Sequence, residues 1–428
     1  MAFFIEVIMA FTGATAGLAA GAQTNETLVD FALEATYATP PTGNYQALRI
    51  TGETLAGQQT TARPSELNAQ KQVAQSVVTQ ITASGTISGV LSSGTFDNLI
   101  AGVMGNDWIA ATISGSSDSK SGFFYNPSNQ YTGGLANVNA IDAASIATVV
   151  SWPDSGYVYI YDPDNKIQNF FQYQKTGAAG IIELFPKGCL DAYVTSGQNS
   201  NAGPNARLFG PALVNGALDK TFTIRKKLLG SFLMYPGSLV TQIEFQLQQA
   251  QFGTVTVDVT SANEQQTDAD VSTAVLAAPS GKVHNSVNNF LGALINGQAP
   301  AGCVTQFTCT LARDGAKNDY GMGHADACGA QNGQFIVSGS IEFYFRTWDE
   351  YKASISGTQG PIVVTTVDDD GNGYAFMFSN AALRNAKVNS SQANATVTAS
   401  FDIEGNPDAN GGPAFAIYRL TGIPATGS

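Results

Sequence analysis

The segment with the clearest potential for chemistry is Asp368-Asp-Asp-Gly-Asn-Gly373. Asp368, Asp370 and Asn372 occupy the first, third and fifth positions of a calcium-loop pattern, and a Gly stands at the sixth. The twelfth position is Ser379, so the bidentate Glu that completes an EF-hand loop is missing. Strand-like residues flank the segment, and Asn-Gly suits the turn of a β-hairpin. We therefore expect a hairpin turn here and keep a calcium site as the alternative.

Other residues that could support catalysis are few. The chain has two histidines, His284 and His324, which is little material for a His-based metal site or a catalytic triad. Nucleophile-elbow and P-loop patterns are absent. Ser117-Asp-Ser-Lys120 matches the SxxK pattern, but it lies in a Ser/Gly-rich stretch without the companion motifs. The sequence therefore predicts neither an enzyme nor a cofactor.

The cysteines do not form a recognisable framework. Four Cys in 428 residues (Cys189, Cys303, Cys309 and Cys328) are too few for a disulfide-rich scaffold. No CxxC pair exists, so the common zinc and thioredoxin patterns are missing. We interpret these residues as buried thiols.

The charge balance argues against tight binding to nucleic acid. The chain carries 33 acidic and 20 basic residues, a formal net charge of −13, and such a surface repels phosphates. The basic cluster Arg225-Lys-Lys227 is interpreted as a solvated strand end or an inter-subunit salt-bridge partner rather than a DNA site. The aromatic run Phe170-Phe-Gln-Tyr173 is interpreted as core rather than a ligand platform.

Composition indicates the elements that position these residues. Charged residues make up only 12% of the chain and Gly numbers 45, which together with abundant Thr, Val and Ser favours an all-β protein with many turns. Residues 1–23 resemble a signal peptide, but Glu6 stands where a positive region is needed and the first basic residue is Arg49. We expect an N-terminal arm on a protein made in the cytoplasm, with Met9 as an alternative start. No segment has the length and hydropathy of a membrane span.

A pattern that occurs twice suggests a duplicated domain. A strand-like stretch at Gly85–Leu91 precedes Thr95–Gly105, and another at Phe335–Phe345 precedes Thr347–Gly357. Each Thr suits a helix N-cap, each final Gly suits a left-handed helix stop, and the apolar residues between them have helical spacing. The sequence predicts two copies of one unit, each with a short helix behind a strand.

The predicted organisation follows from this repeat. We expect an N-terminal arm (1–44), a first domain (45–262) that contains an inserted β-rich surface module (113–215), a linker (263–302), and a second domain with a C-terminal arm (303–428). Each domain also contains a long polar loop, and loops of this length usually have a function.

Several stretches together resemble the major tail tube protein of long, non-contractile-tailed bacteriophages. They are Ala47–Leu55, Ser65–Ala74, Gly85–Trp108, Phe222–Arg225, Gly333–Phe345, Thr347–Gly357 and Gly371–Tyr374. The resemblance covers nearly the whole chain except 113–215. It implies a mainly β fold of two tandem tail-tube-type β-sandwich domains, each with a flanking α-helix, plus the inserted module outside the tube.

The resemblance also implies an assembly. Family members form stacked rings of six tube domains with inner strands joined between subunits, so a chain with two domains would form trimeric rings. DNA would pass through an acidic lumen without specific binding during ejection into the host, and other tail proteins (tape measure, tail tip, terminator) would be partners. The protein would be made in the host cytoplasm and would reside in the virion. Loops 56–80 and 312–331 resemble the family's ring-to-ring contact loops. The ring-stacking candidates in them are Arg63, Glu66, Lys71, Arg313 and Lys317.

Two other function classes remain open at this point. A secreted or cell-surface β-sandwich adhesin fits the Ser/Thr/Asn-rich composition, although no clear signal peptide or anchor accompanies it. A hydrolase with a β-jelly-roll fold is the third interpretation. Only Asp368–Asp370 and scattered carboxylates support it.

Overall fold

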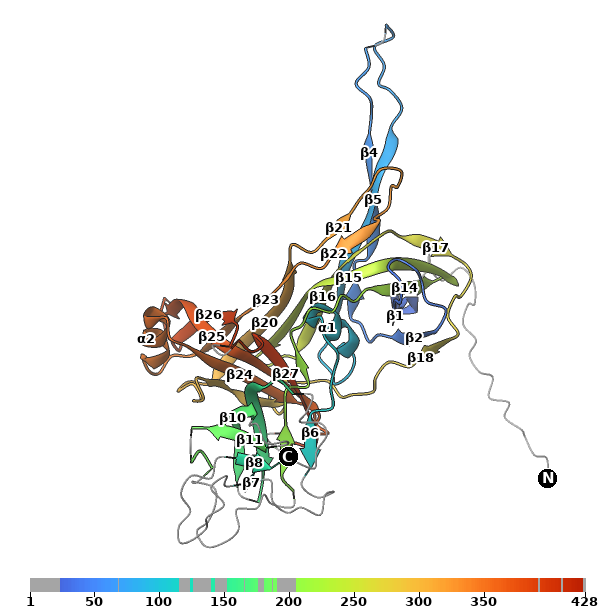
Figure 1. Ribbon diagram of the computed structural model, residues 1–428. Coiled ribbons are helices and arrows are strands. Elements are labelled where there is room, and N and C mark those ends of the chain that lie inside the picture. Colours follow the sequence, from blue (N-terminus) through green and yellow to red (C-terminus); the bar gives the residue numbers. More distant parts are fainter. Residues whose placement is uncertain are drawn as a thin grey trace, which may run out of the picture.

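The computed structural model describes most of the chain. The described ranges are 24–67, 69–114, 124–125, 140–142, 152–164, 166–175, 181–186, 188–190, 205–391, 393–408 and 411–425. They form a mainly β protein with two α-helices and one short 3-10 helix, η1 (Thr24–Glu26), as the composition predicts. Figure 1 shows a body of strands, a long hairpin projecting from the top and a smaller module at the bottom.

The first group of elements, here called the N-terminal unit, surrounds helix α1. Its elements are β1 (Leu28–Leu33), β2 (Asn44–Ala47), β3 (Gly52–Glu53), β4 (Ala56–Ala62), β5 (Val77–Val90), α1 (Asp97–Met104), β14 (Phe222–Leu228), β15 (Ser231–Gln248), β16 (Thr254–Ser261), β17 (Gln265–Thr267) and β18 (Ala274–Leu276). β18 lies parallel to β2, whereas the other pairings within this unit are antiparallel.

The second group, the C-terminal unit, surrounds helix α2. Its elements are β19 (Phe290–Ile295), β20 (Val304–Asp314), β21 (Lys317–Asp319), β22 (Gly329–Gln331), β23 (Gln334–Tyr344), α2 (Asp349–Ser356), β24 (Gln359–Val367), β25 (Gly373–Asn389), β26 (Thr398–Asn406) and β27 (Phe415–Leu420). The interval 263–302, expected to be a linker, contains three strands, and β19 pairs with β24 of this unit.

The two units repeat one order of strand pairing. In the N-terminal unit β1 pairs with β14, β14 with β15, β15 with β16, β16 with β5, and β5 with β3 and β4. In the C-terminal unit β19 pairs with β24, β24 with β25, β25 with β26, β26 with β23, and β23 with β20. The long strands β15 and β25 each pass from one sheet of a sandwich into the other.

Both helices end as the sequence predicts but begin differently. Gly105 and Gly357 adopt left-handed conformations with φ of 64° and 68°, which suits glycine at a helix stop. The N-cap positions are Phe96 and Trp348, one residue after the expected threonines, and neither makes a side-chain capping bond. Thr347 Oγ1 instead donates to Glu350 Oε2 at 3.2 Å, so this hydroxyl does not cap the helix.

The inserted module forms a separate sheet. Its strands are β6 (Thr112–Ser114), β7 (Phe124–Tyr125), β8 (Ala140–Asp142), β9 (Ser155–Asp162), β10 (Ile167–Lys175), β11 (Ile181–Phe185) and β12 (Arg207–Phe209), followed by β13 (Leu213–Val214), which returns to the body and pairs with β27. The candidate Ser117–Lys120 lies outside the described residues. Phe171 and Tyr173 are core of the module, as predicted.

The module packs against the C-terminal unit, although it is inserted in the N-terminal one. Tyr159 and Phe209 join a cluster with Val363, Met377 and Tyr418 of the strands β24, β25 and β27. The Tyr418 hydroxyl donates to the Tyr157 carbonyl at 2.7 Å. The module therefore covers the sheet that contains β24 and β27 and ties the two halves together.

Two residues of the basic cluster at 225–227 form ion pairs within the chain. Arg225 is 1% exposed and binds Asp30 through Nε and Nη2 at 2.7 and 2.8 Å, and Asp270 through Nη1 at 2.8 Å. Lys226 Nζ lies 2.5 Å from Glu53 Oε1. The interpretation as a solvated strand end or an inter-subunit partner is therefore wrong for Arg225 and Lys226, whereas Lys227 is exposed next to the end of β14. Arg225 holds Asp30 and Asp270 against β14.

His284 is buried where the two units meet. Its Nδ1 lies 2.9 Å from Thr366 Oγ1, and its ring stacks on Tyr374. Burial lowers the pKa of His284 to about 4, and the nearby Asp369 carboxylate offsets this only in part. The folded protein therefore holds this imidazole neutral.

The pKa of His284 predicts acid sensitivity. Between pH 6.5 and about pH 4 the unfolded chain binds a proton at His284 that the folded chain does not, so stability falls as the pH falls. The expected slope from this group is up to about 1.4 kcal/mol per pH unit. In urea unfolding across this range, His284→Gln should show a flatter pH dependence than the wild type. His324→Gln, at an exposed position, should retain the wild-type slope; equal slopes for all three proteins would contradict this account.

Candidate functional surface

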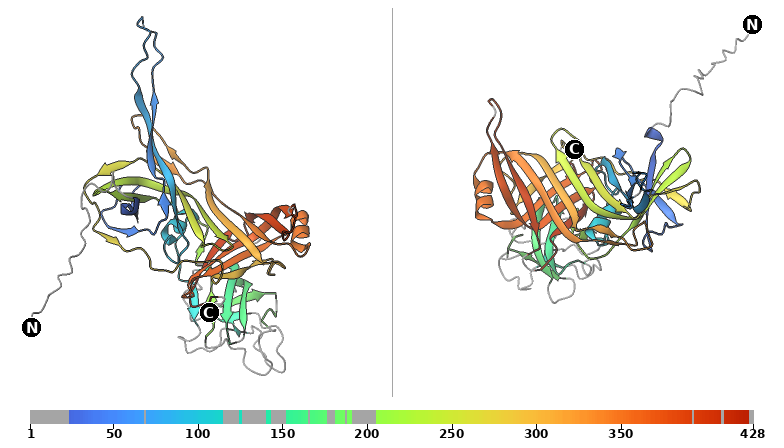
Figure 2. Two further views of the ribbon diagram at one scale, coloured as in Figure 1. Left: turned by 180° about the vertical axis from the view of Figure 1, so that it is seen from behind. Right: turned by 90° about the horizontal axis from the view of Figure 1, so that it is seen from above.

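One continuous sheet joins the two units. The second half of β15 pairs antiparallel with β20, from Gln242 opposite Ala312 to Gln248 opposite Gln306. The strand order β4–β5–β16–β15–β20–β23–β26–β25 therefore runs through both units without a break. The view from above in Figure 2 shows these strands side by side across the body. We call the contact of residues 242–248 with residues 306–312 the joint.

Two equivalent glycines permit the close packing in this sheet. A Cβ on Gly85 would lie 2.7 Å from the Thr54 carbonyl oxygen, and one on Gly339 would lie 2.3 Å from the Thr308 carbonyl oxygen. Ser84-Gly85 of β5 is therefore equivalent to Ser338-Gly339 of β23. Ser84 lies opposite Ala56 of β4, and Ser338 lies opposite Thr310 of β20.

One face of the joined sheet is polar across both units. Residues directly opposite one another on neighbouring strands share a face, so the pairing register defines rows. One such row is Ser88, Thr256, Glu244, Thr310, Ser338 and Glu404. The next is Val90, Thr254, Gln246, Thr308, Ser340, Asp402 and Arg384. None of these side chains is buried.

The opposite face is the hydrophobic core. The row between those two is Gly89, Val255, Phe245, Cys309, Gly339, Ile403 and Leu383. Val255, Phe245 and Cys309 are fully buried in the main apolar cluster. Strict alternation along each strand therefore separates core from polar face, as period-two patterning requires.

Carboxylates outnumber basic groups on the polar face. The face bears Glu244, Asp258, Glu342, Asp402 and Glu404 among Ser, Thr and Gln residues, against Arg384 and Lys387. Arg384 is paired with Glu404, Nε to Oε2 at 2.9 Å. Thr86 donates to Asp258 at 2.8 Å, and Thr305 donates to Glu342 at 2.8 Å. This surface is polar and carries more negative than positive groups, so it has few groups that could bind phosphates.

Arg313, the next residue of β20 after the joint, binds the end of helix α1. Its guanidinium Nε donates to the Val103 carbonyl at the end of α1 at 2.6 Å, and Nη2 donates to the Gly216 carbonyl at 3.3 Å. The residue is 7% exposed, and burial lowers its pKa. Arg313, expected in a surface loop, is therefore not available for contact with another ring, because its charge satisfies carbonyls inside the chain.

The two long loops differ in structure. Strands β4 and β5 extend into a hairpin that projects far above the body (Figure 1). Its residues 63–67 and 69–73 are exposed, and they include the candidates Arg63, Glu66 and Lys71. The equivalent loop of the C-terminal unit folds back on the N-terminal unit, where the Ile81 amide donates to the Ala325 carbonyl at 2.7 Å. Lys317 in β21 is exposed.

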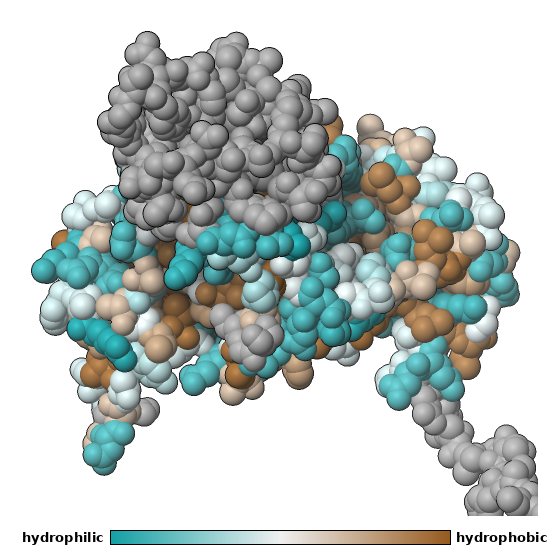
Figure 3. Space-filling model, turned by 90° about the horizontal axis from the view of Figure 1, so that it is seen from below, coloured by the Kyte–Doolittle hydropathy of each residue, from teal (hydrophilic) through white to brown (hydrophobic). Residues whose placement is uncertain are grey.

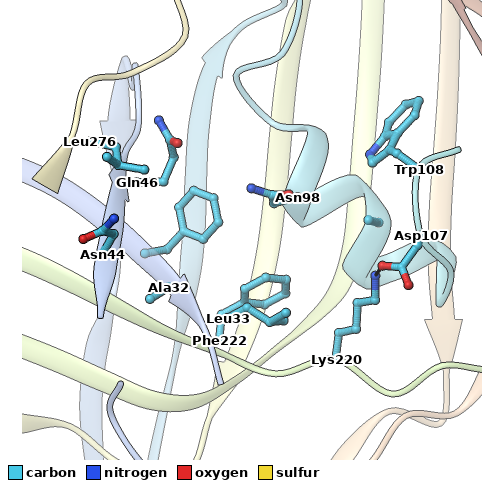
Figure 4. A pocket seen from close by; sticks show the side chains of 12 residues that line it. Ala32, Leu33, Asn44, Gln46, Asn98, Asp107, Trp108, Lys220, Phe222 and Leu276 are labelled. Atoms are coloured by element: carbon cyan, nitrogen blue, oxygen red, sulfur yellow. Dashed lines mark hydrogen bonds and ion pairs between the residues drawn. The ribbon is translucent and has the colours of Figure 1, made fainter. Parts of the chain in front are cut away.

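A hollow lies beside α1. It has a volume of about 530 Å³ and is bounded by β1, β2, β18 and α1, with Phe31, Phe222, Leu276 and Trp108 among its lining residues. Its charged lining residues, Lys220 and Asp107, are already paired at 2.5 Å, and Figure 4 shows them at one end of the hollow. Nothing in this set resembles a catalytic arrangement. Seen from below, the surface outside the grey atoms is a mosaic of hydrophilic and hydrophobic residues (Figure 3).

The calcium-loop candidate forms the expected hairpin turn between β24 and β25. Asp368 Oδ1 accepts the amides of Asp370 and Asn372, each at 2.9 Å. Asp370 pairs with Lys282 at 2.7 Å, and Asp369 accepts from Asn289 at 2.9 Å, so the three carboxylates have separate partners. In the described part of the chain, no group of three or more His, Cys, Asp or Glu residues is placed to hold a metal ion.

Among the cysteines, Cys309 is buried, and burial raises the pKa of its thiol. Cys303 and Cys328 are exposed, so the expectation of buried thiols is wrong for these two. Within the described ranges, no helix is long and apolar enough to cross a membrane.

Comparison with known protein families shows which family the chain belongs to. The sequence model of a family described as phage tail tube protein matches residues 24–413. The chain belongs to the phage tail tube protein family. A search of curated proteins finds no match. Tail tube proteins are structural, non-enzymatic components of the virion tail that assemble into a tube, so the family match confirms the structural interpretation over the adhesin and the hydrolase.

Sequence reasoning predicted a repeat but did not predict the polar face, which depends on register. The signal was present as alternation in Thr254–Ser261, where Val255, Val257 and Val259 point to the core and Thr256 and Asp258 to the other side. Which strands join across the units, and therefore which polar residues line up, is not encoded locally.

The close approach at Gly339 generates a prediction for this tail tube protein. Gly339→Ala should destabilise the chain by about 1–3 kcal/mol, since the new methyl group would overlap the Thr308 carbonyl. Urea unfolding measures the change. Gly329→Ala is the matched control, because no atom lies within 4 Å of its added Cβ. A Gly339→Ala midpoint equal to that of Gly329→Ala would show that the strands are not packed this closely.

Proposed function

We propose that each chain contributes two tandem tube domains, that three chains form a ring, and that stacked rings form a DNA conduit of the siphophage type. The single observation that carries this proposal is the polar face, which continues across both units on one joined sheet. A surface of Ser, Thr, Gln and carboxylates suits a bore that phage DNA traverses, because it is wettable and repels phosphates.

The repeated order of pairing supports two domains per chain. Each unit has its own sandwich, its own helix and the same sequence of strand contacts. Since members of the resembled family have six tube domains in a ring, three such chains supply them. The DNA passes without specific binding, and other tail proteins close the two ends of the tube.

The position of the inserted module is consistent with this arrangement. The module covers the outer sheet of the C-terminal unit through Val363 and Met377, whereas the polar face belongs to the other sheet of the sandwich. Module and polar face therefore lie on opposite sides, and the module projects outside the tube where a bore does not restrict its size.

We assign the contact between rings to the β4–β5 hairpin. Its exposed residues Arg63, Glu66 and Lys71 are placed to reach a neighbouring ring, and Leu67 and Val73 expose 105% and 77% of their surface. Lys317 at the base of the shorter loop is a further candidate. Exposed apolar side chains on a projecting hairpin are unfavourable in water, and a contact that buries them lowers the free energy.

Charge reversal on the polar face tests the conduit. Glu244→Lys in the phage should slow DNA ejection, with a larger effect at low salt, because each added lysine attracts passing phosphates. The rate of DNA release after receptor triggering is the measurement. Asp268→Lys makes the same charge change at an exposed site away from the polar face and should leave ejection unchanged. Assembled Glu244→Lys tails that eject at the wild-type rate would exclude this face from the bore.

A further inference from the structure

The hollow beside α1 is an open end of the N-terminal sandwich. Phe31 and Leu33 share one side of β1, and Phe222 lies opposite Leu33 on β14. Phe31 and Phe222 are buried in the main apolar cluster, whereas Leu33, which also lines the hollow, is 56% exposed. The apolar interior therefore continues into the hollow as a wall that the described residues leave uncovered.

Strand β18 forms one side of the hollow (Figure 4). Leu276 lines the hollow and is 47% exposed, and the whole strand Ala274–Leu276 is accessible to solvent. Among the described strands, β18 pairs with β2 alone. The hollow has a volume of about 530 Å³, which is within the range of protein ligand pockets, so several apolar side chains fit into it.

The hollow also contains an ammonium group with a spare donor. Lys220 Nζ donates to the Asn106 carbonyl at 2.7 Å and to Asp107 Oδ1 at 2.5 Å. An ammonium group has three N–H donors, so one of them has no acceptor among the described residues. The Lys220 side chain is only 12% exposed, which limits the access of water to this donor. The hollow therefore suits an apolar occupant that carries one carboxylate.

The segment of this chain with the matching chemistry is Phe3-Phe-Ile-Glu-Val-Ile8. It belongs to residues 1–23, which lie outside the described ranges, and Glu6 is the one charged side chain in that stretch of sequence. In an extended segment Phe4, Glu6 and Ile8 share one side. A carboxylate between two large apolar groups thus matches a spare ammonium donor beside an apolar wall.

We propose that the segment Phe3–Ile8 occupies the hollow of its own chain. Glu6 accepts a hydrogen bond from Lys220, and Phe4 and Ile8 pack against the apolar wall. This contact is favourable because it removes apolar surface of both the segment and the wall from water. The carboxylate is not buried without a partner, since Lys220 supplies the donor. The inference concerns the single folded chain and does not depend on the proposed ring.

The length of the connection favours the same chain over a second copy. Leu33, which lines the hollow, is at the far end of β1 from Thr24, and the six residues of β1 span about 20 Å. The stretch from Glu6 to Thr24 can extend to about 60 Å, so it is long enough to return along β1. A tethered segment reaches an effective concentration in the millimolar range at its site, which a second copy in dilute solution does not match.

Hydrogen exchange tests whether the segment covers the wall. Phe4→Asp combined with Ile8→Asp should raise the exchange rate of the Ala274–Leu276 amides about tenfold, the effect of losing the burial of one large apolar side chain. Thr15→Asp combined with Ala19→Asp adds the same charges further along the same stretch and should exchange like the wild type. Equal exchange rates for the two double variants would overturn the packing of Phe4 and Ile8 in the hollow.

A zero-length carbodiimide tests the ion pair on the unaltered full-length chain, because it joins a carboxylate to an amine only where the two are in contact. Peptide mapping of the monomer band should show Lys220 linked to Glu6. A link from Lys220 to Asp107, which are in contact in the structure, is the internal positive control. Links to Asp107 without any link to Glu6 would overturn the proposal.

An equal mixture of nitrogen-15-labelled and unlabelled chains separates the two sources of the segment. If the occupant belongs to the same chain, every Lys220–Glu6 peptide carries one label state throughout. Peptides that combine a labelled and an unlabelled half would identify a second copy as the occupant and overturn the assignment to the same chain.

Discussion

The antiparallel pairing of β15 with β20 is the interaction on which the rest of the structure depends. It turns two sandwiches into one sheet, from β4 at one end to β25 at the other. Because antiparallel register fixes which residues face each other, this contact also sets the alignment of every polar and apolar row across the two units. A slip of one residue would place Phe245 and Leu247 on the polar face, and the core would lose them.

The function of this protein depends on the separation of polar and apolar side chains onto the two faces of the joined sheet. It does not depend on a set of catalytic residues. The core rows stabilise each unit, and the polar rows form a hydrated, acidic surface. The sheets that do not carry the polar face need separate covers, and the chain supplies a different one for each unit. The ion pairs of the buried Arg225 with Asp30 and Asp270 hold the segments over the N-terminal unit, and the inserted module covers the C-terminal unit.

Local signals predicted the elements well and the contacts between distant elements poorly. The duplicated helix stops at Gly105 and Gly357 and the turn at Asp368–Gly373 were readable because each depends on a few adjacent residues. The buried roles of Arg225 and Arg313 were not, because their partners lie far away in sequence. Strands β17 to β19 were missed for the same reason: these short segments acquire strand structure only from the neighbours that they pair with.

The central claim is that the polar face of the joined sheet lines the bore of a tube built from three chains per ring. A cryo-electron microscopy reconstruction of the assembled tail tests it most directly. The account predicts threefold rings in which Glu244, Asp258 and Glu342 of every chain point into the bore and the inserted module lies outside. A tube whose bore is lined by the outer sheets, or rings that hold six copies of the chain, would contradict it.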